Sequence, residues 1–122
     1  MTGTSISFKE MCAKFDVTPR TLRYYEYIEL LSPEKDGRAR WYGPRELARM
    51  TLIMRGRRFG FPLEDIRQWL LIYEEKGTRI QMEAWVEAAD GQIDALNTQL
   101  DELKETIKDL KKLRDETIET LT

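Results

Sequence analysis

The segment Thr18-Pro19-Arg20-Thr21-Leu22-Arg23-Tyr24-Tyr25-Glu26 places a helix start beside two arginines and two tyrosines. Pro19 suits the first turn of a helix, where its missing N–H is unpaired in any case, and the threonine before it is a suitable N-cap. Arg20, Arg23 and Tyr24 then lie near the N-terminal end of that helix. Arginine binds guanine edges and phosphates, and tyrosine hydroxyls bind phosphate oxygens, as the second helix of a helix-turn-helix requires. An ordinary capped surface helix begins in the same way, so the flanking sequence is needed to distinguish it from a DNA-binding helix.

The preceding residues predict a short helix over about 7–15. Ser7 and Glu10 have the spacing of a capping box. Cys12 shares the apolar face of this helix, so we interpret it as a core residue and not as a reactive thiol. The four members of that face are Phe8, Met11, Cys12 and Phe15. After a turn, the second helix is expected over about 18–28, with Leu22 and Tyr25 facing inward.

A small β-hairpin is predicted between Ser32 and Tyr42. Lys35-Asp36-Gly37 supplies the turn, and the residues after it alternate as a strand does, with Arg38 and Arg40 on one face. A basic hairpin that follows a helix-turn-helix is a wing. A solvated edge hairpin, whose charges prevent aggregation, would show the same pattern.

Two prolines mark the starts of two further helices, expected over about 44–58 and 62–75. Gly60 can adopt the left-handed conformation that ends a helix. The Arg57-Arg58 pair is therefore expected in a loop between these helices, where it would contact a phosphate backbone as a second wing. A solvated charge cluster is the alternative for this pair.

Residues 79–120 predict one long helix with a narrow apolar seam. Its members alternate at spacings of four and three residues, as in a coiled coil: Met82, Val86, Ala89, Ile93, Leu96, Leu100, Leu103, Ile107 and Leu110. The chain offers no second long helix to cover this seam, and the simplest partner is another copy. We therefore expect a winged-helix domain over 1–76 and a dimerisation helix over 77–122.

The net charge of −2 hides a difference between the two parts of the chain. Residues 1–80 carry 15 basic and 11 acidic side chains, whereas residues 81–122 carry 5 basic and 11 acidic ones. The excess is concentrated in residues 18–58, where 10 basic side chains, nine of them arginine, face 5 acidic ones. This asymmetry suggests a nucleic-acid-facing part and a different partner for the acidic part.

The composition also excludes several classes of site. One cysteine and no histidine leave no internal disulfide, no Cys/His zinc site and no histidine-based catalytic triad, so we expect neither an enzyme nor a metal or cofactor. No stretch approaches the ~20 apolar residues of a membrane span. The start Met1-Thr2-Gly3-Thr4-Ser5 does not resemble a signal peptide, so we expect a cytoplasmic protein.

Taken in order, these features resemble the MerR family of bacterial transcriptional regulators. The resemblance covers essentially the whole chain and lies in the Leu22-Arg23-Tyr24-Tyr25-Glu26 run, the wing ending in Tyr42, the Arg58-Phe59-Gly60-Phe61 segment and the long helix. It implies a mainly α fold, a winged helix-turn-helix domain followed by a long helix that forms an antiparallel coiled coil. It further implies a homodimer on a pseudo-palindromic operator, which bends and untwists promoter DNA for RNA polymerase.

The resemblance also implies roles for individual residues. The family often has glycine where Glu29 stands, so a left-handed turn there would cost about 1 kcal/mol. The wing reads Arg38-Ala39-Arg40-Trp41, where the family commonly has Gly-Tyr-Arg. The DNA contacts implied are Thr18, Arg20, Thr21, Arg23 and Tyr24 from the recognition helix, Arg38, Arg40 and Tyr42 from the first wing, and Arg57 or Arg58 from the second.

What the chain senses is less defined. Residues 81–122 lack Cys and His, which excludes the family's metal and redox sensors on ligand chemistry. The chain looks similar to small members that govern branched-chain amino acid and acyl-CoA breakdown. A candidate effector cleft would involve Trp69, Tyr73, Met82 and Trp85, although hinge packing between domain and coil is the interpretation we favour for these residues. Two other functions stay open: an excisionase-like architectural DNA binder, and a coiled-coil adaptor that binds proteins.

Overall fold

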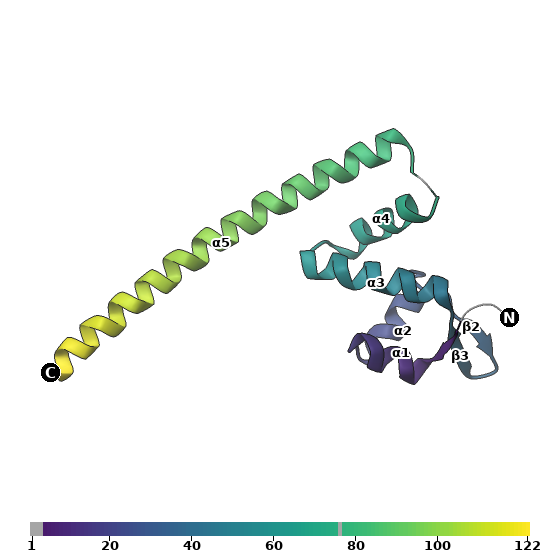
Figure 1. Cartoon of the computed structure of the whole chain (residues 1–122), viewed down its shortest axis with the longest axis horizontal. Helices are drawn as coiled ribbons and strands as arrows, with labels where there is room; N and C mark the ends of the chain where they lie inside the picture. Colours follow the sequence, from purple (N-terminus) through teal and green to yellow (C-terminus); the bar gives the residue numbers. More distant parts are fainter. Residues whose placement is uncertain (1–3, 76) are drawn as a thin grey trace. The chain divides into compact units, whose positions relative to one another are not determined.

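The computed structural model describes residues 4–75 and 77–122, most of which are helical (Figure 1). The chain folds as two compact units, one ending at Thr78 and one running from Arg79 to Thr122. Residue 76, where the sequence predicts the boundary, lies outside the described residues. The elements in chain order are β1 (Ile6–Ser7), α1 (Phe8–Phe15), α2 (Pro19–Tyr27), β2 (Glu34–Asp36), β3 (Ala39–Tyr42), α3 (Pro44–Phe59), α4 (Leu63–Glu75) and α5 (Arg79–Leu121).

The helices begin where their capping residues predict. The Ser7 hydroxyl accepts a hydrogen bond from the Glu10 N–H at 3.2 Å, and the Glu10 carboxylate accepts one from the Ser7 N–H at 3.0 Å. This confirms the capping box of α1. The Thr18 hydroxyl accepts a hydrogen bond from the Thr21 N–H at 3.1 Å and caps α2. Gly60, with φ 86°, ends α3 in the left-handed conformation.

The wing belongs to a small three-stranded antiparallel sheet with the strand order β1-β3-β2. The sequence did not predict β1, whose Ile6 pairs with Tyr42. The hairpin turn also differs from the prediction, because Asp36 pairs with Ala39 and the two turn residues are Gly37 and Arg38. Arg38 therefore lies at the tip of the hairpin and not in the strand.

The first unit has a continuous hydrophobic core. Side chains from α1, α2, α3, α4 and the wing meet in it, and α3 packs closely on α4 at Gly56. A Cβ atom on this glycine would lie 2.8 Å from a side-chain carbon of Ile66, so a larger residue would push the two helices apart. The buried hydrophobic residues are Met11, Leu22, Tyr25, Leu30, Leu31, Tyr42, Met50, Leu52, Ile53, Ile66 and Leu70.

A charged network joins the segment after α2 to α3 and α4. The buried Arg49 donates from Nε to the Leu30 carbonyl oxygen at 2.8 Å, and its Nη1 lies 2.9 Å from a carboxylate oxygen of Glu74. Glu46, also buried, accepts a hydrogen bond from the Ser32 N–H at 2.9 Å. Burial acts to raise the pKa of Glu74, but the hydrogen bonds and charges of Arg49 and its neighbour Arg45 outweigh it and lower that pKa.

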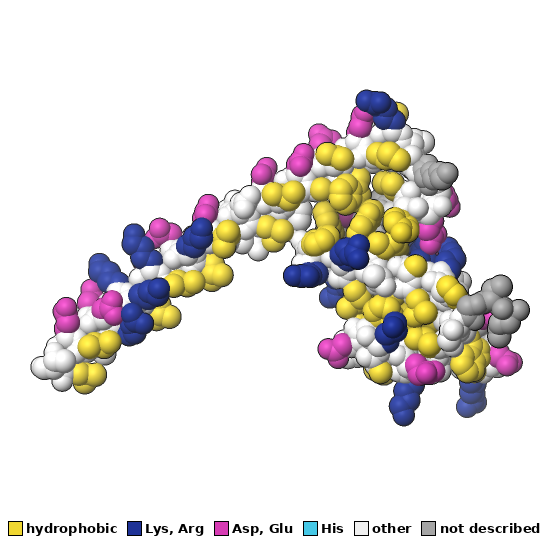
Figure 2. Space-filling model, in the orientation of Figure 1, with side chains coloured by type: hydrophobic (Ala, Val, Ile, Leu, Met, Phe, Trp, Pro, Cys, Tyr) yellow, Lys and Arg dark blue, Asp and Glu magenta, His cyan; other side chains and the backbone are white. Residues whose placement is uncertain are grey.

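The second unit consists of α5, a helix of 43 residues in which no residue is buried. The large side chains of the predicted apolar seam are 41–65% exposed. Figure 2 shows hydrophobic side chains along one side of this helix and charged ones along the other. An isolated helix of this kind leaves a long apolar stripe in water, which is unfavourable.

Candidate nucleic-acid interface

The recognition helix α2 presents the predicted residues to solvent. Leu22 and Tyr25 face inward and are buried, while Arg20, Arg23 and Tyr24 are exposed. This is the orientation that the spacing of the apolar residues predicts. The exposed face of α2 therefore carries two guanidinium groups and a phenol, all of which bind phosphates or base edges.

Phe8 supports two of the basic side chains. The guanidinium of Arg23 lies 5.2 Å from the centroid of the Phe8 ring, and that of Arg40 lies 5.9 Å from it. Both distances are within the range of a cation–π interaction. One ring from α1 thus brings an arginine of the recognition helix and an arginine of the wing to the same place.

A carboxylate on α2 fixes the wing. Arg40 donates from Nε to one oxygen of Glu26 at 2.7 Å, and the Tyr42 hydroxyl donates to the other oxygen. Burial and this hydrogen bond raise the pKa of Tyr42 far above its usual value, so the hydroxyl keeps its proton as the donor. We call this arrangement the Glu26 clasp.

The predicted DNA contact of Tyr42 is wrong. Its side chain is fully buried, on the face of β3 that points toward α2. The alternation along β3 identifies two faces of the strand, but it does not show which face covers the core. In the structure the inner face carries Tyr42 together with Arg40. Arg38 is exposed in the turn, whereas Arg40 is partly buried, with one nitrogen engaged by Glu26.

The second arginine cluster lies at the end of α3. Arg57 and Arg58 occupy its last turn, not a loop, because the helix continues to Phe59 and stops only at Gly60. Both arginines are exposed, and Arg57 donates from Nη1 to the Tyr25 hydroxyl at 2.6 Å. This bond connects α3 to α2. A groove of about 580 Å³ lies beside it, lined by Arg20, Thr21, Tyr24, Tyr25, Arg57, Phe61, Pro62 and Leu63.

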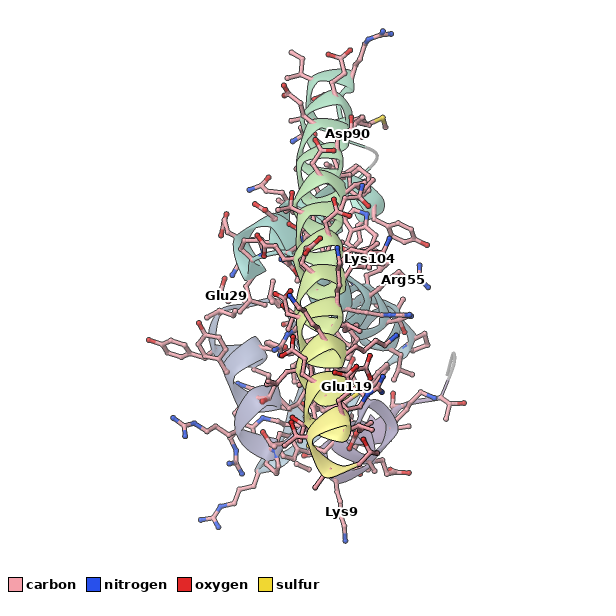
Figure 3. All side chains as sticks on the ribbon, turned by 90° about the vertical axis from the view of Figure 1, so that its left-hand side faces the viewer. Lys9, Glu29, Arg55, Asp90, Lys104 and Glu119 are labelled. Atoms are coloured by element: carbon pink, nitrogen blue, oxygen red, sulfur yellow. The ribbon has the colours of Figure 1, made fainter. Side chains whose placement is uncertain are left out.

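The end of α2 is held by two arginines from neighbouring helices. Arg67 of α4 donates to the Ile28 carbonyl oxygen, and Arg49 of α3 donates to that of Leu30. Cations stabilise the negative end of a helix dipole. Glu29 between these carbonyls has φ 63°, so the left-handed turn considered there is present with a glutamate in it. The exposed side chain of this glutamate is labelled in Figure 3.

Sequence reasoning missed the residues that support this surface. The sequence pattern places Phe8 on a core face and Glu26 in a motif, and it gives neither residue a role toward the wing. One signal exists for Glu26, because a carboxylate among several arginines is expected to pair with one of them. Arg49 and Arg67 give no such signal, since helical spacing does not show which carbonyl an arginine reaches.

The candidate effector cleft remains a prediction. Trp69 and Tyr73 belong to the first unit, and Met82 and Trp85 belong to the second. Trp69 packs against the core, while Tyr73 is largely exposed.

Burial raises the pKa of the Cys12 thiol, as expected for a core cysteine. Among residues 4–75 and 77–122, no three His, Cys, Asp or Glu side chains are grouped to hold a metal ion.

The chain matches two family models. One, described as "MerR, DNA binding", matches residues 47–116, and the other, "MerR HTH family regulatory protein", matches residues 6–71. The chain is also 34% identical to the HTH-type transcriptional regulator HmrR of Rhizobium leguminosarum bv. viciae, over 96 residues that cover 78% of this chain and 67% of that protein.

Solved structures show the same fold. A MerR family transcriptional regulator from Bacillus cereus superposes with a TM-score of 0.71 at 24% identity, covering 86% of this chain and 76% of that one. HiNmlR, a MerR family regulator lacking the sensor domain and bound to promoter DNA, gives a TM-score of 0.66 at 20% identity, covering 86% and 80%. No helix in the described part of this chain is long and apolar enough to cross a bilayer.

Proposed function

Because this chain belongs to the MerR family and is therefore a DNA-binding transcriptional regulator, we propose that two copies act together on one promoter operator. The observation that carries the proposal is the pairing of an exposed basic surface in one unit with an exposed apolar seam in the other. The first suits a polyanion, and the second suits an identical helix. Regulators of this family are generally not enzymes, and we assign no catalysis to the chain.

The proposed DNA contacts fall into three groups. From α2, Arg23 contacts base edges. The neighbouring phosphates are contacted from the helix start by Thr18, Arg20 and Thr21, and by the phenol of Tyr24. Arg38 at the tip of the wing contacts the DNA backbone, and Arg40, whose Nε is paired with Glu26, contacts it through its remaining nitrogens. Arg57 and Arg58 at the end of α3 contact a phosphate farther along. Glu26 and Tyr42 of the clasp set the position of the wing relative to α2, so these two residues act on binding without touching DNA.

The homodimer is proposed from the apolar seam of α5. In a coiled coil with a second copy, the seam residues would be removed from water, at roughly 25 cal/mol for each Å² buried. The two DNA-binding domains would then meet a pseudo-palindromic operator, since the symmetry of a dimer matches an inverted repeat. The family resemblance further supports an antiparallel coil and a promoter whose spacer is bent and untwisted for RNA polymerase.

The effector is proposed only by chemical class. Cys12 is the one thiol and there is no histidine, so these residues do not fit a thiolate or imidazole metal site. Packing at the junction of domain and coil stays the favoured role of Trp69, Tyr73, Met82 and Trp85, with contact to a small organic molecule as the alternative. We place the activity in the cytoplasm, where bacterial promoters lie.

A selection experiment tests this function. The protein is incubated with a pool of random-sequence duplexes, bound DNA is recovered over several rounds, and the affinity of a recovered duplex is measured at several salt concentrations. We expect an inverted repeat and an affinity that falls by roughly 10³-fold or more between 50 and 200 mM salt, as several neutralised phosphates require.

The same experiment discriminates the two other functions. Absence of any salt-dependent binding would favour a protein-binding adaptor. Binding without an effect on transcription from a promoter that carries the selected repeat in an overlong spacer would favour an excisionase-like architectural protein. Dimeric binding with a change in transcription supports the proposal.

A further inference from the structure

The side chains beside the apolar seam define how two copies of α5 align. We propose that the antiparallel pair of helices adopts one register, with its two-fold axis at the level of Thr98. This inference rests on the homodimer of the proposed function and adds the register and the groups that select it. It commits the exposed seam to a single occupant, the same helix of a second copy.

The basic side chains of α5 that follow Arg79 are all in one segment, residues 104–114. Residues 81–103 carry six acidic and no basic side chains, whereas residues 104–114 carry five basic and two acidic ones. Figure 2 shows acidic groups along the first part of the helix and a mixture of basic and acidic groups farther along. Residues 115–119 carry three further acidic side chains. A parallel pair would place like charges side by side, while an antiparallel pair places the acidic part against the basic part.

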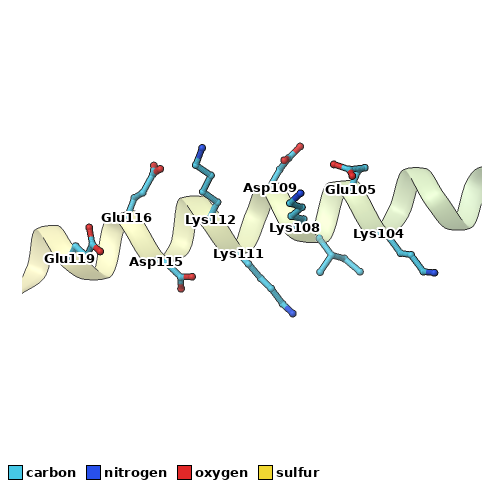
Figure 4. A pocket seen from close by; sticks show the side chains of 10 residues that line it. Lys104, Glu105, Lys108, Asp109, Lys111, Lys112, Asp115, Glu116 and Glu119 are labelled. Atoms are coloured by element: carbon cyan, nitrogen blue, oxygen red, sulfur yellow. The ribbon is translucent and has the colours of Figure 1, made fainter.

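One row of side chains flanks the seam at seven-residue intervals. Each member follows a seam residue directly, and we call these five residues the flanking row: Glu83, Asp90, Asn97, Lys104 and Lys111. Figure 4 shows Lys104 and Lys111 extending to the same side of the helix, with Lys112 on the other side. In an antiparallel coiled coil, two such rows, one from each helix, face each other along one edge of the interface.

The register follows from matching this row with itself. When Leu96 packs in one layer with the partner's Leu100, Asp90 lies opposite the partner's Lys104, and Glu83 lies opposite the partner's Lys111. Asn97 then meets its own copy beside the axis. Counted over both helices, this register gives eight fully apolar layers and four pairs of opposite charge.

Neighbouring registers are poorer. A slip of one heptad that brings Glu83 opposite the partner's Lys104 keeps eight apolar layers but leaves only two charge pairs. The opposite slip also has two charge pairs, and it places Arg114 opposite Ala89 and Thr117 opposite Val86, which separates the outer Met82–Leu121 layers from the six continuous apolar layers between Ile93 and Leu110. The apolar seam alone therefore tolerates a slip, and the flanking row removes that ambiguity.

Distances between spin labels test the register. Ala84 and Lys112 are exposed, lie 14 residues to either side of Thr98 and fall outside the seam and the flanking row. Each is replaced by cysteine and labelled in a full-length Cys12→Ala background, and the distance between the two copies of the label is measured by pulsed dipolar spectroscopy. At ~1.5 Å per residue, we expect the same axial separation, about 42 Å, from both sites.

Other alignments give different distances. A slip of one heptad shortens one of the two separations by about 10 Å and lengthens the other by as much. A parallel pair would reduce both to roughly the width of two helices, about 20 Å. Either result overturns the proposed register. The Cys12→Ala protein itself serves as the control for dimerisation and DNA binding.

A charge exchange tests the flanking row. Asp90→Lys alone and Lys104→Asp alone are each expected to weaken dimerisation by roughly tenfold at low salt, and the double variant is expected to recover it. The matched control is Glu87→Lys with Lys108→Glu, which exchanges the same charges outside the row and should have little effect at each step.

The outcomes separate this inference from the proposed function. A protein that stays dimeric and binds its operator, but shows no recovery in the Asp90 and Lys104 double variant, overturns the register and leaves the function intact. A full-length protein that stays monomeric at all concentrations overturns the proposed dimer itself.

Discussion

The N-terminal domain and α5 differ in where their apolar side chains lie. Among the described residues of the domain, 11 hydrophobic ones are buried, whereas α5 has 43 residues and none is buried. The two units also treat charge differently, because Arg49 and Glu46 are buried in the domain with partners, while the charges of α5 face water. The domain therefore has a core of its own, and α5 acquires one only with a second chain.

The largest effect is expected from a charge placed in the apolar seam. Leu96→Asp would bury two carboxylates in the coil, so we expect a dimer dissociation constant at least about 100-fold higher. Operator affinity should fall with it, since linked domains bind two half-sites more tightly than separate ones. Sedimentation and DNA titration measure both quantities. Thr98→Asp, on the outer face of α5, is the control. Equal dimer dissociation constants for the two variants would contradict the assignment of Leu96 to the dimer seam.

A core truncation in the domain should act on stability and not on assembly. Leu70→Ala removes a fully buried side chain from α4, and we expect the free energy of unfolding of the domain to fall by about 2–5 kcal/mol. Chemical denaturation followed at two protein concentrations gives this value and its dependence on the dimer. Leu71→Ala, at a partly exposed neighbour, should cost much less. A similar loss of unfolding free energy in both variants would mean that the buried face of α4 is assigned incorrectly.

The exposed face of α2 should determine sequence preference. Arg23→Ala is expected to cost about 1–3 kcal/mol of binding free energy on the preferred operator and less on unrelated DNA, if the guanidinium contacts a base. Arg23→Lys keeps the charge but loses the paired hydrogen bonds, so it should retain nonspecific binding only. An equal loss on all sequences would reassign Arg23 to a phosphate.

The charged network of the domain should make its stability depend on pH. The pKa of Glu74 is lowered in the folded state, so its stabilising contribution is present above the unfolded pKa and is lost as the pH falls through the folded pKa. Glu74→Gln should cost roughly 1–3 kcal/mol near pH 7 and progressively less below about pH 4.5. Denaturation from pH 7 to pH 3 measures this difference, with Glu75→Gln as the exposed control. A constant difference across this range would refute the role of the pair.

The smallest effect is a gain in stability. Glu29 adopts φ 63°, a conformation that costs a residue with a side chain about 1 kcal/mol, so Glu29→Gly should stabilise the domain by about that amount. Asp16→Gly, at φ 53°, is the comparison, because aspartate tolerates this conformation better and the gain should be smaller. Thermal melting gives both values. A loss of stability at Glu29→Gly would show that its side chain has a structural role.

Most of the architecture could be predicted because its signals are local. Ser7 with Glu10 marks the start of α1, Pro19 and Pro44 open α2 and α3, and Gly60 ends α3. The seam of α5 is predictable for the same reason, since its 4-3 spacing is a property of one helix. The two-residue strand β1 could not be predicted because a strand this short has no alternation to detect.

The candidate site was less predictable, because its details depend on contacts between distant segments. The sequence of β3 does not show that its inner face brings the Tyr42 hydroxyl to the carboxylate of Glu26, 16 residues earlier in the chain. Two arginines before a glycine suggest a turn at Arg57 and Arg58, whereas the helix runs to the glycine. Residue type and exposure are predictable for α2, and the partners that fix the wing are not.

The number of copies on one operator tests the central claim most directly. Mass photometry of the full-length protein on a selected inverted-repeat duplex counts the subunits in each complex. Two copies are expected on every occupied duplex, with no single-copy complex at concentrations where the free protein is dimeric. A single copy that occupies the duplex at full affinity would contradict the account.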